Sequence, residues 1–356
     1  MNVYEEMIPY LLHWYRYNAR VLPWREDPSA YHVWISEIML QQTRVEAVRA
    51  YYMRFLEELP DVKALAECPD DRLMKLWEGL GYYSRARNLK KAAEKVIADY
   101  EGIIPSEASE LRKLPGIGDY TAGAVSSIAY GRPEPAVDGN VLRVMSRLTG
   151  SRDDILSADT KKRITAELKA VMPGEESGAL NQAIMDIGAT ICIPNGAPHC
   201  EECPLTHICT AFHNGTTGEI PVRAAKTARR TEKKTVLLIG VGDRILLHKR
   251  PAKGLLAGLY EYPNVPGHIA KKDVPAAVSA ILSDAMGEQC AEPVAVKKAD
   301  DAKHVFSHIE WQMKAYRADV RMCGTDLMLS EGYVLVTTQE LKEQYSVPSA
   351  FAKWDV

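Results

Sequence analysis

Two carboxylates lie in sequence contexts that would give them different affinities for a proton. Glu37 belongs to the run VWISEIML, and a carboxyl group among apolar side chains keeps its proton to a higher pH. Asp138 begins the run DGNV at the start of a helical periodicity, and a helix N-terminus favours the ionised form. A protonated carboxyl group beside an ionised one can divide the work of a general acid and a counter-ion.

Both carboxylates also have simpler explanations. Glu37, Gln41 and Arg44 recur at helical spacing, so they could form a solvated stripe opposite the apolar face of a helix over residues 29–43. Asp138 could serve only as the N-cap of the helix that follows it. The spacing alone leaves these alternatives open.

Four of the seven cysteines form a cluster that is typical of a metal site. The spacing C-x7-C-x2-C-x5-C runs through Cys192, Cys200, Cys203 and Cys209. Four thiolates suit tetrahedral zinc, but zinc sites usually present two close pairs, and the unequal spacing equally suits a 4Fe–4S cluster. The isolated cysteines are predicted to be small buried side chains: Cys68, Cys290 and Cys323.

A tight turn between two helical segments has the features of a phosphate site. In LPGIG, residues 114–118, Gly116 and Gly118 remove Cβ atoms that would obstruct a backbone close to a partner. Helical spacing resumes at Asp119, so exposed amides would lie near a helix N-terminus, where phosphate binds. These features are typical of a helix-hairpin-helix element that binds the DNA backbone, although an ordinary glycine-bearing turn can have the same sequence.

The composition predicts an intracellular protein with two domains. The chain has 356 residues, of which 46% are hydrophobic, which is enough for two cores. The N-terminus has no basic segment before an apolar core, and no apolar run could cross a bilayer, so we expect a cytoplasmic protein without signal peptide, transmembrane segment or membrane partner. The net charge is −3, so DNA binding would depend on where the charges lie rather than on their sum.

The pattern of elements changes near residue 223. Residues 1–222 show short helical periodicities, for example over 45–56, 71–79, 86–97 and 180–191. Residues 223–234, RAAKTARRTEKK, carry six basic residues against one acid and are predicted to be a solvated linker, with contact to DNA phosphates as the alternative. Residues 235–356 predict an α+β domain, with strands over 235–241, 244–248, 305–316 and 332–337 and a helix over 274–286.

Several motifs together resemble one enzyme family. LPGIG followed about twenty residues later by VDGNV resembles the endonuclease III-like superfamily of DNA base-excision glycosylases. Four further motifs resemble the adenine DNA glycosylases of the MutY type: PWR at 23–25, WISEIMLQQT at 34–43, WEGLGYYSR at 77–85 and LNQA at 180–183. The resemblance implies a multidomain fold, with an all-α helix-hairpin-helix glycosylase region that carries an iron–sulfur cluster loop, followed by an α+β Nudix-like domain.

The resemblance also implies roles for the residues near the two carboxylates. Glu37 would protonate adenine, and Asp138 would stabilise the oxocarbenium sugar or bond to it transiently, with Asn140 in the same catalytic set. Bifunctional relatives carry a lysine where this chain has Tyr120, and a phenol cannot form a Schiff base with the sugar. We therefore expect a monofunctional glycosylase with weak or no lyase activity.

Other residues are assigned to DNA by the same resemblance. Trp24, Arg25 and Gln182 would hold the extruded adenine, and core packing is the alternative for Trp24. Gly116 and Gly118 would contact the DNA backbone. The residues expected to contact the duplex where the base has left are Gln41, Thr43 and Tyr82, and core packing is again the alternative for Tyr82.

In the family, a loop of four cysteines after the helix over 180–191 holds a 4Fe–4S cluster, so the resemblance favours that cofactor over zinc. This chain departs from the family in its first interval, IPNGAPH, which has seven residues instead of six. In the C-terminal domain, KGLLAGLYEYP at 253–263 resembles the entry to the Nudix-like domain, but no Glu-rich helix follows to hold magnesium. Phe306, Ser307 and His308 match the family's loop that recognises 8-oxoguanine.

The expected partner is double-stranded DNA with an adenine opposite 8-oxoguanine or guanine, bound by a monomer. Three other classes remain as alternatives. A bifunctional endonuclease III-like glycosylase is disfavoured by Tyr120, and a nucleotide pyrophosphatase is disfavoured by the missing Glu-rich helix. A catalytically silent mismatch-binding protein would lack Glu37 or Asp138, and both are present.

Overall fold

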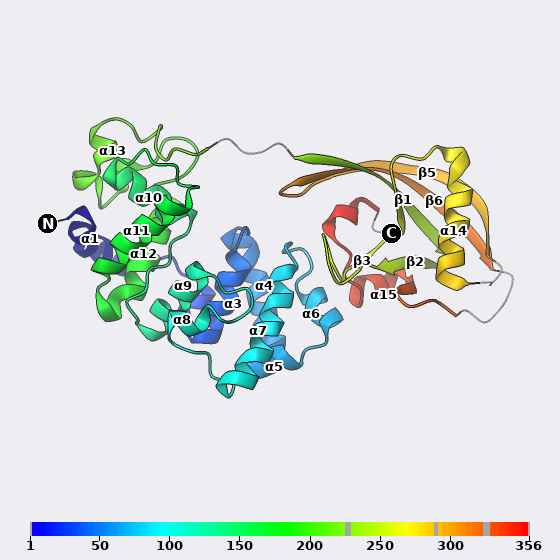
Figure 1. The fold of residues 1–356 in the computed structure, drawn as a ribbon, viewed down its shortest axis with the longest axis horizontal. Coiled ribbons are helices and arrows are strands. Elements are labelled where there is room, and N and C mark those ends of the chain that lie inside the picture. Colours follow the sequence, from blue (N-terminus) through cyan, green and yellow to red (C-terminus); the bar gives the residue numbers. More distant parts are fainter. Residues whose placement is uncertain (1, 225–228, 288–290, 323–327, 355–356) are drawn as a thin grey trace. The chain divides into compact units, whose positions relative to one another are not determined.

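A computed structural model of the chain describes residues 2–224, 229–287, 291–322 and 328–354. The chain forms two compact units, and each is described by itself. The helical unit comprises Met1–Cys68 and Arg87–Ala225, and the sheet unit comprises Pro69–Ala86 and Lys226–Val356 (Figure 1). The sequence-based division placed residues 69–86 with the helical region, whereas in the structure this segment packs with the sheet unit.

Short helices make up the first two hundred residues of the chain (Figure 1). Local signals set their ends: the side chain of Asp138 caps one helix, and Gly131 and Gly150 end two helices with φ of +66° and +70°. The helices are α1 (Val3–Asn18), α2 (Pro23–Glu26), α3 (Ala30–Leu40), α4 (Val45–Glu58), α5 (Val62–Glu67), α6 (Asp70–Leu76), α7 (Ser84–Tyr100), α8 (Ala108–Leu111), α9 (Asp119–Tyr130), α10 (Gly139–Thr149), α11 (Ala158–Val171), α12 (Ser177–Thr190) and α13 (Thr210–His213).

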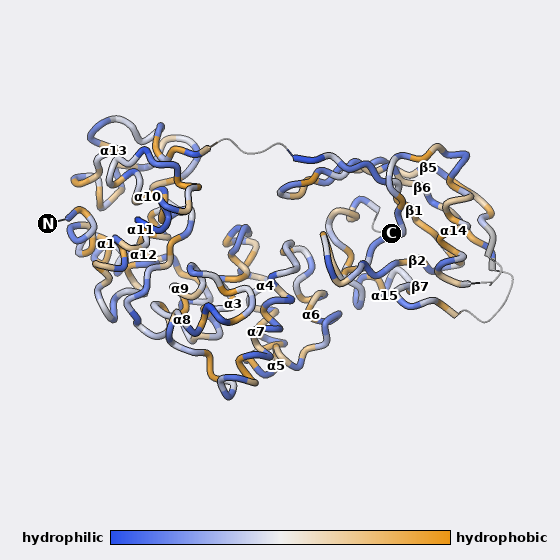
Figure 2. The backbone as a smooth tube through the Cα atoms, in the orientation of Figure 1, coloured by the Kyte–Doolittle hydropathy of each residue, from blue (hydrophilic) through white to orange (hydrophobic). Residues whose placement is uncertain are grey.

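Helix α12 organises the core of the helical unit because it packs against α1, α9 and α10. Leu11, Met145 and Ile184 are buried together in this core. At Gly178 the backbone of α12 comes so close to α9 that an added Cβ would lie 2.7 Å from the carbonyl oxygen of Ser127. Figure 2 shows hydrophobic and hydrophilic residues alternating along these helices, as expected for helices with one buried face.

The sheet unit contains a mixed sheet, with the strand order β3-β2-β1-β6-β5 and with β4 pairing with β1 and β7 with β2. β1 and β6 are parallel, in a register that aligns Val236 with Ala315, and the other pairs are antiparallel. The strands are β1 (Arg230–Val241), β2 (Arg244–Lys249), β3 (Tyr260–Glu261), β4 (Asn264–Pro266), β5 (Ala291–Val305), β6 (Ile309–Met322) and β7 (Tyr333–Thr337).

Both faces of this sheet are covered, which explains why the central run TVLLIGV is apolar throughout. Leu237 and Ile239 pack against helix α14 (Val274–Met286), which lies across one face (Figure 1). Val236 and Leu238 face the opposite core, which contains Trp311 and helix α15 (Thr338–Glu343).

The structure corrects three details of the predicted elements. The second half of the expected linker is strand, because Arg230 to Lys234 pair with β6, and residues 225–228 lie outside the described residues. The expected strand over 305–316 is interrupted, because the Phe306 amide donates to the Ile309 carbonyl and residues 306–308 form the turn between β5 and β6. Arg44 does not share the α3 stripe, because α3 ends at Leu40.

Two further expectations concern cysteines and membranes. Cys68 is buried, as predicted, whereas Cys290 and Cys323 lie outside the described residues. Among the residues that the structure describes, no helix is both long enough and apolar enough to span a bilayer.

Candidate active site

A cleft of about 540 Å³ lies within the helical unit, between α2, α3, α9, α10 and α12. The sequence-predicted residues that line it are Trp24, Arg25, Glu37, Gln41, Thr43, Tyr120, Asp138, Asn140 and Gln182. These residues come from segments up to about 160 positions apart, as the numbers of Trp24 and Gln182 show. The fold therefore brings both carboxylates to one cavity.

Glu37 lies in the middle of α3, with only 6% of its surface exposed. The hydroxyl of Tyr120 donates a hydrogen bond of 2.6 Å to Glu37 Oε2. Burial raises the pKa of Glu37 to about 7; the Asp138 charge adds to the rise, while the Tyr120 hydrogen bond and Arg25 oppose it. At neutral pH the side chain is thus close to half protonated, and it can give up a proton inside the cleft.

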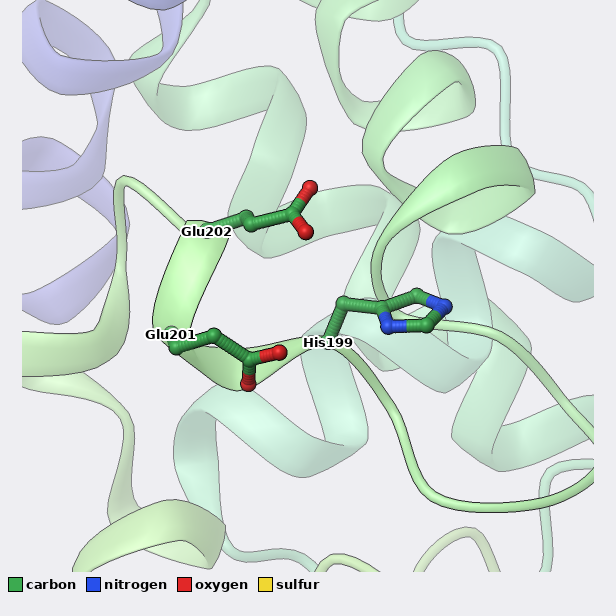
Figure 3. Close-up of side chains that lie close together, drawn as sticks. All are labelled: His199, Glu201 and Glu202. Carbon is green, nitrogen blue, oxygen red and sulfur yellow. The ribbon is translucent and has the colours of Figure 1, made fainter.

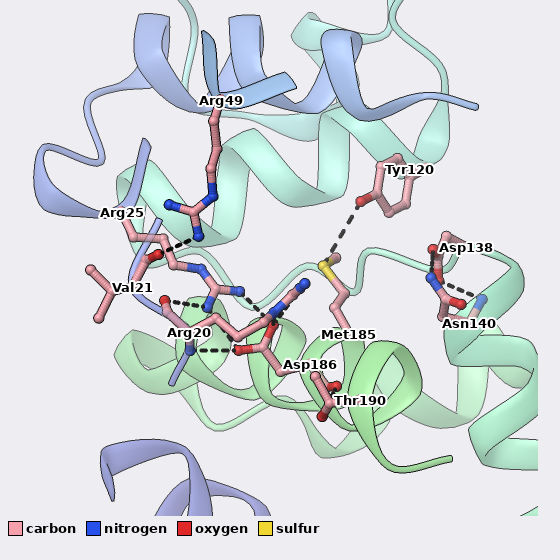
Figure 4. Close-up of polar contacts among 10 residues, drawn as sticks. All are labelled: Arg20, Val21, Arg25, Arg49, Tyr120, Asp138, Asn140, Met185, Asp186 and Thr190. Carbon is pink, nitrogen blue, oxygen red and sulfur yellow. Dashed lines mark hydrogen bonds and ion pairs between the residues drawn. The ribbon is translucent and has the colours of Figure 1, made fainter. Parts of the chain in front are cut away.

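Tyr120 is the second residue of α9. Burial raises the pKa of its hydroxyl well above 10, and the charges of Glu37 and Asp138 raise it further. The phenol therefore stays protonated and acts as a donor. The same hydroxyl lies 3.8 Å from the sulfur of Met185, which also lines the cleft (Figure 4).

Asp138 is the N-cap of α10 and accepts three hydrogen bonds. The amides of Asn140 and Val141 donate to Oδ1 at 2.9 and 2.8 Å, and Nδ2 of Asn140 donates to Oδ2 at 2.9 Å (Figure 4 shows this pair). Burial raises the pKa of Asp138 above its ordinary value, although these donors and Arg143 favour the anion. From the sequence, a helix cap was an alternative role for Asp138 and the helix N-terminus was a reason for its ionisation, but the opposing effect of burial was not predicted.

A charged cluster that the sequence did not predict forms another part of the wall. Asp186 of α12 has no exposed side-chain surface and binds two arginines (Figure 4). Arg25 donates from Nη1 and Nη2 at 2.8 and 2.9 Å, and Arg20 donates from Nε at 2.7 Å. A sequence signal for Asp186 does exist, because it lies four positions after Gln182 and so on the same helix face.

Three more residues of the helical unit were predicted to hold adenine or to contact the duplex: Trp24, Gln182 and Gln41. Trp24 is buried and packs edge-on against Tyr52, with ring centroids 5.4 Å apart, so it both lines the cleft and belongs to the core. Gln182 Nε2 donates to the Gly178 carbonyl at 3.3 Å, and Gln41 Nε2 donates to the Thr121 hydroxyl at 3.4 Å. Both are long contacts, so a ligand can replace them at little cost.

The LPGIG turn joins α8 and α9 as a helix-hairpin-helix element. Gly116 has φ of +77°, and an added Cβ would lie 2.6 Å from Cβ of Asn88, so no other residue fits there. Gly118 is exposed, and apart from its chain neighbours no atom of the described residues lies within 4 Å of the place where its Cβ would be. The turn therefore presents an open backbone surface at the N-terminus of α9.

Tyr82, which is predicted to contact the duplex, lies beside Ser307 of the predicted 8-oxoguanine loop, and both residues belong to the sheet unit. The hydroxyl groups of Tyr82 and Ser307 lie 2.9 Å apart and share a hydrogen bond. Tyr82 is half exposed and has φ of +47°, an unusual backbone conformation for a tyrosine. His308 is exposed, whereas Phe306 packs against Trp311, with ring centroids 4.9 Å apart.

The four clustered cysteines, none of which is in a disulfide, line one small pocket with apolar residues such as Leu148 and Ile187. In tetrahedral zinc sites the sulfurs lie about 3.8 Å apart. Among the described residues, no three of these thiols have sulfurs within 4.8 Å of one another. Burial raises the pKa of the Cys203 thiol to about 12, so a bound cation is needed to hold it as thiolate.

Another group of metal-binding side chains lies in the same loop. His199, Glu201 and Glu202 place ligand atoms within 4.8 Å of one another (Figure 3). All three are exposed. Exposed acidic groups commonly lie together without a metal, so we assign no site to them.

Comparison with known proteins agrees with this geometry. Residues 35–173 match the family described as HhH-GPD superfamily base excision DNA repair protein, and residues 235–354 match a NUDIX domain. An adenine DNA glycosylase of Mus musculus is 32% identical over 358 residues, which cover 86% of this chain and 69% of that protein. The chain belongs to the adenine DNA glycosylases. The predicted family and fold class are thereby confirmed.

Two further similarities extend this assignment of the chain to the adenine DNA glycosylases. An adenine DNA glycosylase of Arabidopsis thaliana is 35% identical over 88% of this chain, which spans 57% of that longer protein. The solved structure of a thermostable thymine-DNA glycosylase has a TM-score of 0.54 and 27% identity, and covers 60% of this chain and 97% of its own. The helix-hairpin-helix fold is thus shared with a glycosylase named for another base.

Proposed function

We propose that this protein removes adenine from double-stranded DNA where the adenine is mispaired with 8-oxoguanine or guanine, by hydrolysis of the N-glycosidic bond. Residues 1–222 would carry the reaction and residues 235–356 would read the opposite base. The observation that carries the proposal is Glu37, a buried carboxyl group with a pKa of about 7 that shares a cleft with Asp138. Membership in the adenine DNA glycosylases supports the choice of base.

Glu37 would act as the general acid. An adenine extruded from the stack must enter a pocket to be reached, and the cleft in the helical unit has the size of a small-molecule site. Loss of adenine as an anion is slow, so a proton delivered to the base makes it a better leaving group. The half-protonated carboxyl group of Glu37 supplies that proton at neutral pH.

Asp138 would stabilise the sugar that the base leaves behind. Positive charge develops on the sugar as the bond breaks, and an anion fixed in place beforehand lowers the barrier. The two α10 amides and the Asn140 side chain hold the Asp138 carboxylate in one orientation. Water then completes hydrolysis, or the carboxylate first bonds to the sugar and is released by water.

The cleft favours a monofunctional reaction. Strand cleavage by a lyase needs an amine that forms a Schiff base with the sugar. The cleft residues include Tyr120 at the corresponding position, and its hydroxyl is committed to Glu37. The product would therefore be an intact strand with an abasic site.

The loop over Cys192–Cys209 would hold one 4Fe–4S cluster through its four cysteines. The four cysteines line one pocket, and their unequal spacing in the sequence supports this choice over zinc. Cys192 near one end of the loop and Cys209 at the other would both hold the cluster, which would stabilise the loop. Arg147 of α10 already donates to Cys192 Sγ at 3.3 Å and to the Ile193 carbonyl at 3.0 Å, so the loop is anchored there.

Ser307 and His308 would read the base opposite adenine. A serine hydroxyl can pair with either a donor or an acceptor on a base edge, and both side chains are exposed on the β5–β6 turn. We expect Ser307→Ala combined with His308→Ala to reduce the preference for adenine opposite 8-oxoguanine over adenine opposite guanine by about tenfold, one lost base contact being worth about 1–3 kcal/mol. Single-turnover rates on the two duplexes measure this ratio, and an unchanged ratio would refute the assignment.

A single-turnover assay tests the proposed function as a whole. The substrate is a duplex with one adenine opposite 8-oxoguanine, and the products are resolved with and without alkali. We expect strand breaks only after alkali, because hydrolysis leaves an abasic site in an unbroken strand. Breaks without alkali would indicate a lyase, and tight binding without any breaks would indicate a mismatch-binding protein.

A further inference from the structure

The proposed roles of the cleft residues do not explain why one buried carboxylate pairs with two arginines. Asp186 is fully buried and forms ion pairs with both Arg20 and Arg25; these three residues are called the Asp186 cluster. Arg25 binds it through two parallel hydrogen bonds, and Arg20 binds it through both its side chain and its backbone amide, the latter at 3.2 Å. The bidentate pair fixes the plane of the Arg25 guanidinium group.

Both arginines line the cleft that contains Glu37. Arg25 lowers the pKa of Glu37, and Glu37 in turn favours the charged form of Arg25, so the two groups interact electrostatically. Without Asp186, two positive charges would face the cleft from this wall; with it, the net charge of the cluster is +1. A general acid needs a neighbourhood that does not hold its anion too well.

We propose that Asp186 is a positioning residue that holds Arg20 and Arg25 in the cleft wall and offsets one of their two charges, so that a large share of Glu37 stays protonated at neutral pH. The inference rests on the proposed function, because it concerns the acid of that reaction. Asp186 itself touches neither carboxylate of the reaction in any contact that the structure records; it acts through the arginines.

The charged and titratable groups around both acids are few among the described residues. Glu37 interacts with Tyr120 of α9, Asp138 at the start of α10 and Arg25 of α2. Asp186 interacts with Arg25, with Arg20 from the segment before α2, and with Tyr15 of α1, whose ring lies 5.5 Å from the Arg25 guanidinium. Although burial alone would raise it, the two arginines lower the pKa of Asp186, so this carboxylate stays charged throughout the range in which Glu37 titrates.

Opposite changes in charge should therefore move the pH profile of excision in opposite directions. Asp186→Asn leaves two uncompensated arginines, which stabilise the Glu37 anion, so we expect the midpoint of the profile to fall by about one pH unit. Arg20→Gln leaves Asp186 with one arginine, and we expect the midpoint to rise. The double variant Asp186→Asn with Arg20→Gln restores a charge of +1, and its midpoint should return toward the wild-type value.

The measurement is the single-turnover excision rate from pH 5 to pH 9, at saturating enzyme, for the wild type and these three variants. Arg20→Lys keeps the charge and should keep the wild-type midpoint. Asp153→Asn removes an exposed aspartate that pairs with Arg163 at 2.6 Å outside the cleft, and it serves as the matched control. At pH 7.5 we expect Asp186→Asn to be about tenfold slower than this control.

Four outcomes can be told apart. Shifts of opposite sign, with recovery in the double variant, support the inference. Slower excision at every pH without a shift would mean that Asp186 only maintains the fold, and the inference would be wrong. If Asp186→Asn does not fold, Arg20→Gln still tests the proposal, because the Arg25–Asp186 pair is intact in that variant. An unchanged midpoint of the pH profile in Arg20→Gln would contradict the proposal. An inactive wild type would instead refute the proposed function.

Discussion

Glu37→Gln should lower the single-turnover rate of adenine excision at pH 7 by about 10³-fold, because glutamine cannot donate the proton that the leaving base needs. The amide keeps the size of the side chain and can still accept the hydrogen bond of Tyr120. The pH dependence is the sharper readout. Excision by the wild type should fall about tenfold per unit as the pH rises above 7, since the acid form is depleted there, and the remaining rate of the variant should not follow that curve.

The sign of that profile follows from the direction of the pKa shift. The pKa of Glu37 is raised, so the protonated, active form is fully present well below pH 7 and is lost as the pH rises through it. Glu57→Gln is a suitable control, because Glu57 is exposed on α4 and does not line the cleft. A Glu37→Gln variant that excises adenine within about twofold of this control would remove Glu37 from the mechanism.

Asp138→Asn is expected to have the second largest effect. Asparagine caps helices as well as aspartate does, so the start of α10 should survive with little change in melting temperature. The negative charge is lost, however, and we expect excision to slow by about 10²- to 10³-fold. The midpoint of the pH profile should also move down, because the Asp138 charge is one of the causes that raise the pKa of Glu37.

Asp61→Asn provides the matched control for the loss of a capping carboxylate. The Asp61 side chain caps α5 by accepting from the Ala64 amide at 2.8 Å, and it does not line the cleft. The same substitution there should leave both the rate and the pH midpoint unchanged. If Asp138→Asn melts much earlier than this control and loses no activity per folded molecule, Asp138 is a structural cap and nothing more.

The parts of the site that the sequence predicts are those with a local signal. Glu37 within an apolar helix and Asp138 before a helical run can each be recognised from a few neighbours, and their pairing follows from the family motifs. The hydrogen bond from Tyr120 to Glu37 joins residues 83 positions apart, and the Asp186 cluster joins residues up to 166 apart. Nothing in local periodicity specifies such pairs, because they depend on how α3, α9 and α12 pack.

The same limit applies to the fold. The run TVLLIGV predicts a strand, yet the parallel pairing of β1 with β6 joins residues about eighty positions apart and has no local signature. The strand β5 was not predicted, because AEPVAVKKADDAKHV contains a proline, paired acids and only three apolar residues larger than alanine. Its long pairing with β6 supplies backbone hydrogen bonds that compensate for weak strand propensity.

The placement of residues 69–86 affects how the two units are joined. Lys75 donates to the carbonyl oxygens of Leu341 and Tyr345, and the Val347 amide donates to Glu78, so this segment is fastened to the end of the sheet unit. The polypeptide therefore passes from one unit to the other three times, after Cys68, after Ala86 and after Ala225.

Cleavage near residue 225 would thus divide the chain into an N-terminal and a C-terminal piece. The two pieces would stay associated, because residues 69–86 of the first piece are hydrogen-bonded to the sheet unit in the second. A shortened gene product that ends there would carry residues 69–86 without the surface on which they rest. One cut in the chain therefore cannot separate the two units, because the sheet unit includes residues 69–86 as well as the C-terminal part of the chain.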